Sequence, residues 1–529
     1  MRTVIARSGF AVAMGFSVAT AATAHAQGTS APGRPLPAAA PVPSPAPAPP
    51  PPPGPAAAAT PATATNDEAA PIEVPSDLVQ VHEGGLTAEQ AGTRAAMTSW
   101  NAKASEESLR SAEAKVDAAW AGFLPRLTGR GEYERLSEFT PPSIALLPPG
   151  TVIPPGIFPP AVADALTKGF SFPLIFNNWT LQGTITVPVS DYFLTIDQRY
   201  TAATRSEEAA RWNLISARAS ALSDGKIEYY TWLRNRGAVI VAAQALNDQK
   251  THLRDSRNQF AVGNASKADV LRSETAVASA ELALEQATNL SDLTEKQLRV
   301  AMHLPEEQQM LPGEDLQVPL ASFQGNLKQM TAEALSARAE IKSADANAEA
   351  AEKQATVAKA SRYPTLSAFA DGIVANPNPR YFPQTQDTHA TWDAGAIISW
   401  SPNDILTANA SARDLDSQVA SIKANQNNTR DGIEVEVQQD WQGVREADFS
   451  VDSSTREVTS AEEAYRVQGE LFNNGRGTSA TLTDAEGDLT RARLDLLNAR
   501  ANARIARIRL DHALGRDVRP ATVDATAPR

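Results

Sequence analysis

The sequence predicts a mainly helical protein with a smaller β part that crosses a membrane, built as two copies of one structural repeat. Three observations support this fold class. Long stretches without Pro are rich in Ala, Glu, Arg and Leu, which favour helices. Four shorter windows carry strand signals. The order of helix, strand, loop, strand, long helix, glycine turn and helix then occurs twice along the 529 residues.

Residues 1–26 are typical of a secretory signal peptide. Two arginines form a positive start, an apolar stretch follows, and residues 24–26 form a cleavage site of the A-x-A type. A membrane anchor is the alternative, but the apolar stretch is too short to span about 30 Å of hydrocarbon. Export from the cytoplasm is therefore expected.

Composition divides the rest of the chain into a linker, two repeats and a tail. Residues 27–80 are rich in Pro and Ala, which predicts a disordered, semi-rigid spacer. A recognition motif for a Pro-binding module is the less favoured alternative. The first structural repeat is expected over residues 81–310 and the second over residues 311–520. A disordered tail over residues 521–529 follows.

Each repeat is expected to hold two strands. Apolar and polar residues alternate over residues 179–190 and again over residues 392–400, as on a strand with two different faces. Weaker strand signals follow Pro125 and Pro364. Each window has about ten residues, the length that a tilted strand needs to cross a bilayer.

These strands predict an oligomer. After the signal peptide no apolar run approaches the length of about 18 residues that a membrane-spanning helix needs. A closed sheet can cross a membrane because it satisfies its own backbone hydrogen bonds. The smallest membrane barrels have about eight strands, so four strands from one chain are too few. Several copies of the chain must contribute.

Two long helical arms follow the strands. Residues 194–260 and 406–472 each span 67 positions and each end in an F-x-x-G turn, at Gly263 and Gly475. A continuous helix of this length would reach about 100 Å. Equal arms with equal turns are the strongest evidence for an internal repeat.

The helix after each turn carries apolar residues seven positions apart, which indicates coiled-coil packing with left-handed coiling. Small residues three positions later allow close approach of a partner helix. An ordinary amphipathic core helix is the alternative, but it rarely keeps this pattern over four heptads. In the second half the two series are Leu482, Leu489, Leu496, Ala503 and Leu510, and Ala485, Ala492, Ala499, Ala506 and Ala513.

Several function classes are disfavoured by composition. The formal net charge of −13 argues against a nucleic-acid partner. The chain has no Cys, and its six His residues show no metal-ligand spacing. No dinucleotide-binding, P-loop or nucleophile-elbow motif is present either. We therefore expect no cofactor, no metal site and no catalytic residues, and the protein is not predicted to be an enzyme.

At this point the sequence resembles the TolC-like outer-membrane efflux protein family, also called outer membrane factors. The motifs that carry the resemblance are the P-x-L strand openers at Pro125 and Pro364, the Trp-led second strands, the two F-x-x-G turns and the segment 334–341. The resemblance covers about residues 80–516. Each motif is degenerate alone, but their order and spacing together are specific.

The resemblance implies a homotrimer. Its β part would be a 12-stranded β-barrel in outer-membrane lipid, with four strands from each chain. Long coiled-coil helices would form a trimeric α-barrel below it in the periplasm of a Gram-negative bacterium. The expected function is a passive exit duct of a tripartite efflux or type I secretion system, carrying drugs, metals or proteins. The expected partners are a periplasmic adaptor (membrane fusion) protein and an inner-membrane pump of RND or ABC type.

The resemblance also implies functional residues. At the periplasmic gate, Asp484 matches the second of two carboxylates that narrow the entrance, and Thr481 replaces the first. Asp269 matches an acidic residue that ties the helices together, and Arg476 adjoins the position of an expected arginine, which is Gly477 here. The adaptor-docking turns would be Val262, Gly263 and Asn264 in the first half and Asn474, Gly475 and Arg476 in the second.

The membrane strands would be marked by Trp179, Val187, Trp392 and Trp400. These windows also bear on the alternative function, a periplasmic coiled-coil structural or scaffold protein without a channel. Such a scaffold would explain the signal peptide and the helices. It would not explain paired alternating windows with aromatic ends, so the duct is the favoured hypothesis.

Overall fold

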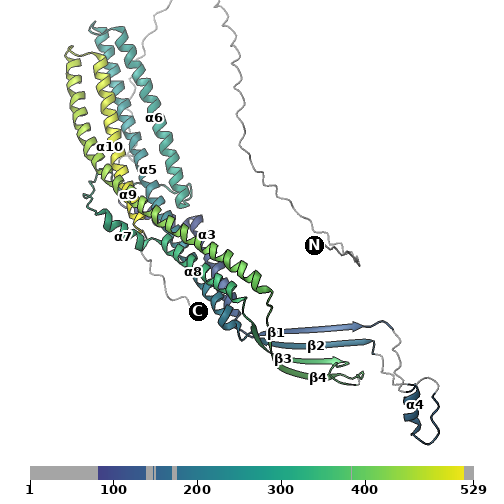
Figure 1. Ribbon diagram of the computed structural model, residues 1–529. Coiled ribbons are helices and arrows are strands. Elements are labelled where there is room, and N and C mark those ends of the chain that lie inside the picture. The colour runs from purple at the N-terminus through teal and green to yellow at the C-terminus, as the bar shows by residue number, and fades with distance from the viewer. Residues whose placement is uncertain (1–81, 139–146, 148–150, 169–174, 383, 518–529) are drawn as a thin grey trace, which may run out of the picture. The chain divides into compact units, whose positions relative to one another are not determined.

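The computed structural model describes residues 82–138, 147, 151–168, 175–382 and 384–517. The predicted signal peptide, the Pro/Ala-rich linker and the tail over residues 521–529 lie outside the described residues. Among the described residues, helices dominate and four strands form one sheet (Figure 1). This confirms the predicted mainly helical fold with a smaller β part.

The same order of elements occurs in both halves. The first half contains α2 (Ala88–Thr98), α3 (Trp100–Ala121), β1 (Arg126–Arg135), α4 (Pro160–Lys168), β2 (Asn177–Val187), a π-helical turn (Tyr192–Ile196), α5 (Asp197–Ala261) and α6 (Lys267–Met302). The second half contains α7 (Leu327–Ala337), α8 (Ala339–Ala360), β3 (Thr365–Asn376), β4 (His389–Ser399), α9 (Asp404–Asn473) and α10 (Ser479–Ala513). Only α4 and the π-helical turn lack a counterpart among these described elements.

The predicted arms are continuous helices. α5 has 65 residues and α9 has 70, so each extends about 100 Å at about 1.5 Å per residue. Each arm reverses through a short turn into α6 or α10, which have 36 and 35 residues. Helices of this length are stabilised mainly by packing against their neighbours.

The long helices pack as two hairpins that meet through α10. α5 packs along α6, and α9 packs along α10, while α10 also packs along α5. The helices α2 and α3 lie against α5, α7 lies against α9, and α8 lies between α5 and α9. As the predicted heptad pattern requires, Leu482, Leu489 and Leu510 are buried.

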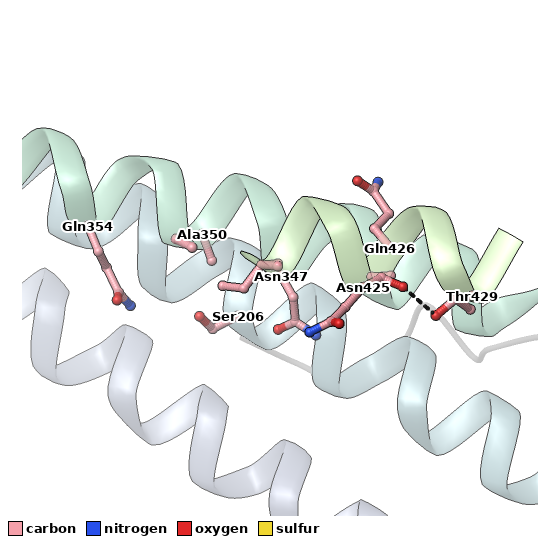
Figure 2. Close-up of a pocket in the computed structure, with 10 residues that line it drawn as sticks. Ser206, Asn347, Ala350, Gln354, Asn425, Gln426 and Thr429 are labelled. Atoms are coloured by element: carbon pink, nitrogen blue, oxygen red, sulfur yellow. Dashed lines mark hydrogen bonds between the residues drawn. The ribbon is translucent and has the colours of Figure 1, made fainter. Parts of the chain in front are cut away.

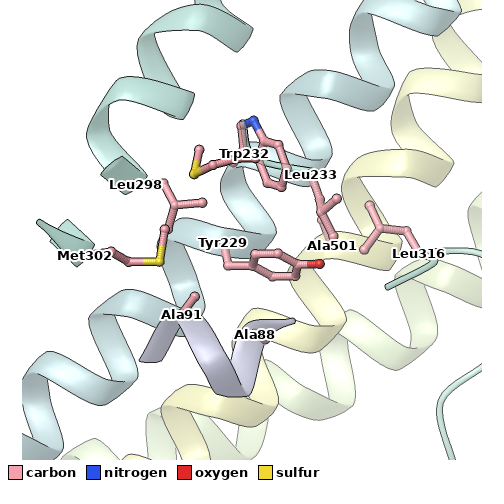
Figure 3. Close-up of a cluster of buried hydrophobic side chains, with 10 residues drawn as sticks. Ala88, Ala91, Tyr229, Trp232, Leu233, Leu298, Met302, Leu316 and Ala501 are labelled. Carbon is pink, nitrogen blue, oxygen red and sulfur yellow. The ribbon is translucent and has the colours of Figure 1, made fainter. Parts of the chain in front are cut away.

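Two apolar clusters hold the short helices to the long ones. In the first, Tyr229 and Trp232 of α5 are fully buried against α2 and the end of α6 (Figure 3). The second joins α7 and α8 to α9 and α10 around Val437 and Val444. The two clusters occupy matching places in the two halves.

The four strands form an antiparallel sheet in the order β1-β2-β3-β4. All four predicted windows are strands of 10 to 12 residues. Two windows extend past their strands. β2 ends at Val187, so residues 188–190 lie beyond it, and β4 ends at Ser399, so Trp400 lies just beyond it. Two residues after Trp400 the chain reaches Pro402, which has no N–H group to continue a strand ladder.

Candidate functional site: the sheet and the helix turns

The sheet has one polar and one apolar face. Directly opposed residues of neighbouring antiparallel strands share a face, so the register Thr184–Asp371–Asp393 defines the polar one. The polar face carries Thr128, Arg130, Glu132, Thr180, Gln182, Thr184, Thr186, Asp371 and Asp393, with Phe369, Ile373 and Ile397 as exceptions. The apolar face carries Leu127, Tyr133, Trp179, Leu181, Ile185, Val187, Leu366, Val374, Trp392 and Ile398.

The apolar face is exposed in the single chain. Leu127 is 75% exposed, Trp392 80% and Ile398 73%. A contiguous apolar surface of this kind marks a contact with lipid or with another protein. The predicted strand residues Trp179 and Val187 lie on this same face, so the alternation in the sequence correctly assigned which side chains share it.

The polar face is tied together by hydrogen bonds. Asp371 of β3 accepts hydrogen bonds from the Thr184 hydroxyl and from Gln182 Nε2, the latter at 3.3 Å, and both donors lie on β2. Arg380, which follows β3, forms an ion pair with Asp393 of β4. These contacts fix polar side chains on one side of the sheet.

Within the described part of the chain, no helix combines the length and the apolar character needed to cross a membrane.

The first helix turn is closed by a capping box. Gly263 has φ +83°, a conformation that favours glycine at a helix end. Ser266 caps α6, and Asp269 Oδ2 accepts hydrogen bonds from its hydroxyl at 2.6 Å and its backbone N–H at 3.0 Å. The hydrogen bond from the Ser266 hydroxyl lowers the pKa of Asp269. Asp269 therefore serves its own helix start.

The second turn has the same course with different contacts. Gly475 has φ +69°, and Thr478 caps α10 by accepting a hydrogen bond from Thr481 N–H at 3.2 Å. A Cβ atom on Gly477 would lie 2.9 Å from the backbone nitrogen of Phe472. This close approach explains the glycine at the position where the resemblance implies an arginine.

Among the described residues, no hydrogen bond or ion pair joins the predicted gate residues to one another, although Thr481 and Asp484 lie three positions apart on one face of α10. Asp484 lies exposed on α10 and forms no hydrogen bond or ion pair with the other residues described here. Thr481 and Arg476 are also exposed, while Asp269 belongs to the other turn. The predicted docking residues Val262, Gly263, Asn264, Asn474 and Gly475 are all exposed as well.

Sequence reasoning missed a buried polar cluster behind the second turn. Glu486 of α10 is only 2% exposed, and neither carboxyl oxygen has a hydrogen-bond partner among the described residues. Closer to the turn, His252 Nε2 of α5 and Ser479 Oγ share a hydrogen bond of 3.0 Å, and the His252 ring packs edge-on against Phe472. All four side chains are buried.

The heptad pattern explains why Glu486 was missed. It occupies the position that follows Ala485 in its heptad, and the equivalent positions later in α10 are Arg493, Arg500 and Arg507. A series of charged residues beside an apolar seam normally indicates a solvated flank. Because α10 packs against both α9 and α5, its buried face is wider than the seam. The signal in the sequence was that Glu486 is the one carboxylate in a series whose later members are arginines.

A groove of about 440 Å³ lies between α5, α8 and α9, and none of its lining residues belongs to the two turns. Its lining is neutral, and Figure 2 shows Ser206, Asn347 and Asn425 pointing into it from the three helices. No group of three or more His, Asp or Glu side chains in the described ranges could hold a metal ion. This groove lacks an acid–base pair or a nucleophile with a base.

Comparison with known proteins decides the family. The model of the outer membrane efflux protein family matches residues 99–302 and 330–516, well over half of the chain. The chain belongs to this family. A comparison with curated protein sequences gives no significant match.

Solved channels share the fold of this outer membrane efflux protein. VceC of Vibrio cholerae is 18% identical with a TM-score of 0.65, and the match covers 81% of this chain and 96% of that one. CmeC of Campylobacter jejuni is 14% identical with a TM-score of 0.65, covering 82% and 89%. MtrE of Neisseria gonorrhoeae, solved in an open state, is 14% identical with a TM-score of 0.64, covering 81% and 88%.

The family assignment gives the function. Outer membrane efflux proteins are channels in the outer membrane that serve as exit ducts of export systems and extend into the periplasm. The family is one of transport proteins, and its members work with adaptor proteins and inner-membrane pumps. The duct hypothesis is thus supported over the coiled-coil scaffold.

Proposed function

We propose that three copies of this efflux protein form one continuous passive duct. The four-stranded sheet with its apolar and polar faces is the observation that carries the proposal. The outer strands β1 and β4 each have one edge that is unpaired in the described chain, and unpaired backbone groups are costly in lipid. Pairing β1 of one copy with β4 of the next closes a 12-stranded barrel around a polar lumen.

The helical hairpins of the three copies would continue this lumen into the periplasm. The turns at the ends of α5 and α9 dock a periplasmic adaptor, which links the duct to an RND or ABC pump in the inner membrane. Their exposure and their glycine conformations support this assignment. The docking residues are Val262, Gly263, Asn264, Asn474, Gly475 and Arg476.

The gate of the duct would be a three-fold ring of Asp484. Its exposure on α10 and its lack of a partner among the described residues leave the carboxylate free to face a lumen. Thr481, one helical turn nearer the α9–α10 turn, and Arg476 within that turn would complete the constriction, while Asp269 secures the first turn. A ring of carboxylates favours cations over anions.

The division of the chain into segments completes the proposal. Residues 1–26 direct export and are removed, and residues 27–80 act as a spacer ahead of the first repeat, residues 81–310. The second repeat covers residues 311–520, and a short tail over residues 521–529 follows it. No cofactor or metal is required for passive conduction.

The duct is tested by reconstituting the mature protein into planar lipid bilayers and measuring single-channel currents. Native mass spectrometry of the detergent complex gives the copy number. Discrete conductance steps from a trimer are the expected result. Recovery as a soluble periplasmic protein without pore activity would reject the proposal.

The gate is tested by Asp484→Ala, which removes the carboxylate ring. We expect a higher single-channel conductance and weaker preference for cations. Asp488→Ala is the matched control, because Asp488 lies four residues further along α10, is exposed and pairs with Arg491 at 2.9 Å. Equal currents in the Asp484 variant and the wild type would remove Asp484 from the gate.

A further inference from the structure

Glu486 is enclosed by three helices. It lies on α10, and α10 packs against α9 and α5. It lies seven positions after Ser479, which places it about 10 Å further from the turn. Two other buried side-chain atoms of this region lack hydrogen-bond partners among the described residues, Gln249 Oε1 and His252 Nδ1 on α5. The region is thus polar, packed and incompletely hydrogen-bonded.

The charges around Glu486 give it no cation. The charge that affects Glu486 most directly is that of Asp248 on α5, which is also negative and therefore disfavours ionisation of Glu486. Arg493 on α10 is held by Glu462 of α9 at 3.2 Å. Burial lowers the pKa of His252, partly offset by the negative charge of Asp255, so the packing disfavours its charged form. The residue equivalent to Glu486 in the first repeat, Glu274 on α6, is paired with Arg257.

Two more groups complete this environment. Tyr465 of α9 lies in the same environment. Burial, followed by the negative charges of Glu486 and Asp248, raises the pKa of its phenol, and Asp255 of α5 contributes as well. Burial also raises the pKa of Asp248. A carboxylate without a cation or a hydrogen-bond donor is costly to bury, and a proton removes that cost.

We propose that Glu486 carries a proton while the α9–α10 hairpin is packed against α5, and that release of this proton to solvent loosens the hairpin and opens the duct entrance. The inference rests on the proposed function for its consequence but not for its chemistry. Glu486 is a positioning residue: it acts on the helices and not on the exported substrate.

The direction of the pH dependence follows from the burial. Burial, followed by the negative charge of Asp248, raises the pKa of Glu486 to about 8. The ionised fraction therefore rises about tenfold between roughly pH 7 and pH 9. Ionised Glu486 and Asp248 would then repel each other between α10 and α5, so the packed hairpin becomes less favourable as the pH rises.

The movement can be measured without conduction. The chain has no Cys, so a cysteine pair at Val262 and Asn474 can be spin-labelled in the full-length protein. Both positions are exposed at the ends of α5 and α9. We expect the label distance to widen from pH 7 to pH 9 in the wild-type background, and to stay at the short distance at both values with Glu486→Gln.

Asp488→Asn is the matched control, because this exposed carboxylate of α10 lies two residues from Glu486. It should keep the wild-type response. A label distance that does not change with pH, or that changes equally in the Glu486→Gln variant, would overturn the proposal.

Infrared difference spectra provide a second measurement that needs no moving hairpin. The stretching band of a proton-bound carboxyl group should disappear from the wild-type protein between pH 7 and pH 9 and be absent from Glu486→Gln. Absence of this band from the wild type at pH 7 would also overturn the proposal. If the band and the distance respond while bilayers show no current at any pH, the proposed duct fails and the proton switch stands.

Discussion

Equivalent carboxylates in the two hairpins lie in opposite environments. Glu274 on α6 and Glu486 on α10 are 212 residues apart, the spacing of the repeat. Glu274 accepts a hydrogen bond from Arg257 at 3.0 Å, with both side chains partly exposed. Glu486 is buried without a partner, and the position equivalent to Arg257 is Gly469. Loss of one cation accompanies the change from a surface ion pair to a buried acid.

The aromatic residues of the two turns differ in the same way. Phe260 is 45% exposed, whereas Phe472 is 7% exposed and its ring centroid lies 5.1 Å from that of His252. The cause is the packing of the helices. α10 lies against both α9 and α5, but α6 packs mainly along α5 and leaves Leu282, Leu293 and Val300 exposed. The repeat therefore fixes the course of the chain but leaves one hairpin with an uncovered apolar face.

The largest difference between the hairpins should appear on removing the aromatic side chains. Phe472→Ala deletes a buried ring, which typically lowers the free energy of unfolding by about 3–5 kcal/mol. Phe260→Ala is the matched variant, and less than about 1 kcal/mol is expected because the ring is half exposed. Denaturant unfolding of the detergent-solubilised protein measures both. Equal losses would mean that assembly buries Phe260 as well.

The second difference should appear as a pH dependence of stability. The pKa of Glu486 is 4.5 when unfolded and about 8 when folded. Between these values the unfolded chain has lost the proton and the folded chain keeps it. Stability therefore falls as the pH rises from 4.5 to 8, by at most about 1.4 kcal/mol per pH unit, and the loss levels off above that range.

Glu486→Gln should remove this contribution, because the amide does not titrate. Melting temperatures of the wild type and the variant, measured across this pH range, give the difference. The wild-type curve should fall relative to that of the Glu486→Gln variant as the pH rises. Glu274→Gln is the matched control, and it should follow the wild type because Glu486 still titrates in it. Parallel curves for the wild type and Glu486→Gln would contradict the prediction.

Much of this architecture could be predicted because its signals are local. The alternation over residues 179–190 assigned the apolar side chains of β2 to one face, and equal arms predicted α5 and α9. Helix and strand periods are properties of the chain itself. Trp400 was misassigned because the strand signal does not mark where a ladder ends.

The state of Glu486 could not be predicted from its own helix. Its burial depends on two partner helices, α9 and α5, and the position in α9 that corresponds to the cation Arg257 is Gly469. These are contacts between distant segments, which a heptad pattern on α10 does not encode. The same limit applies to Asp484, because a ring requires other copies of the chain.

A further variant gives the second hairpin an arginine at the position where the first hairpin has Arg257. Gly469→Arg restores the cation of the first hairpin, and a Cβ atom at this position meets no atom within 4 Å. The nearby positive charge should lower the pKa of Glu486 and flatten the pH dependence of stability. Gly469→Ala is the control: it gains about 1 kcal/mol of helix stability without a charge. Identical pH profiles in the two variants would show that the arginine does not reach Glu486.

The smallest effect is expected from the ion pair of the first hairpin. Arg257→Ala leaves Glu274 partly exposed to water, so the pair should contribute only about 0.2–1 kcal/mol. A double-mutant cycle with Glu274→Gln isolates this coupling, and it should shrink as salt is added because exposed charges are screened. A coupling of several kcal/mol, independent of salt, would mean that the pair is buried when the chains assemble. The two hairpins would then differ in having a partner cation and not in burial.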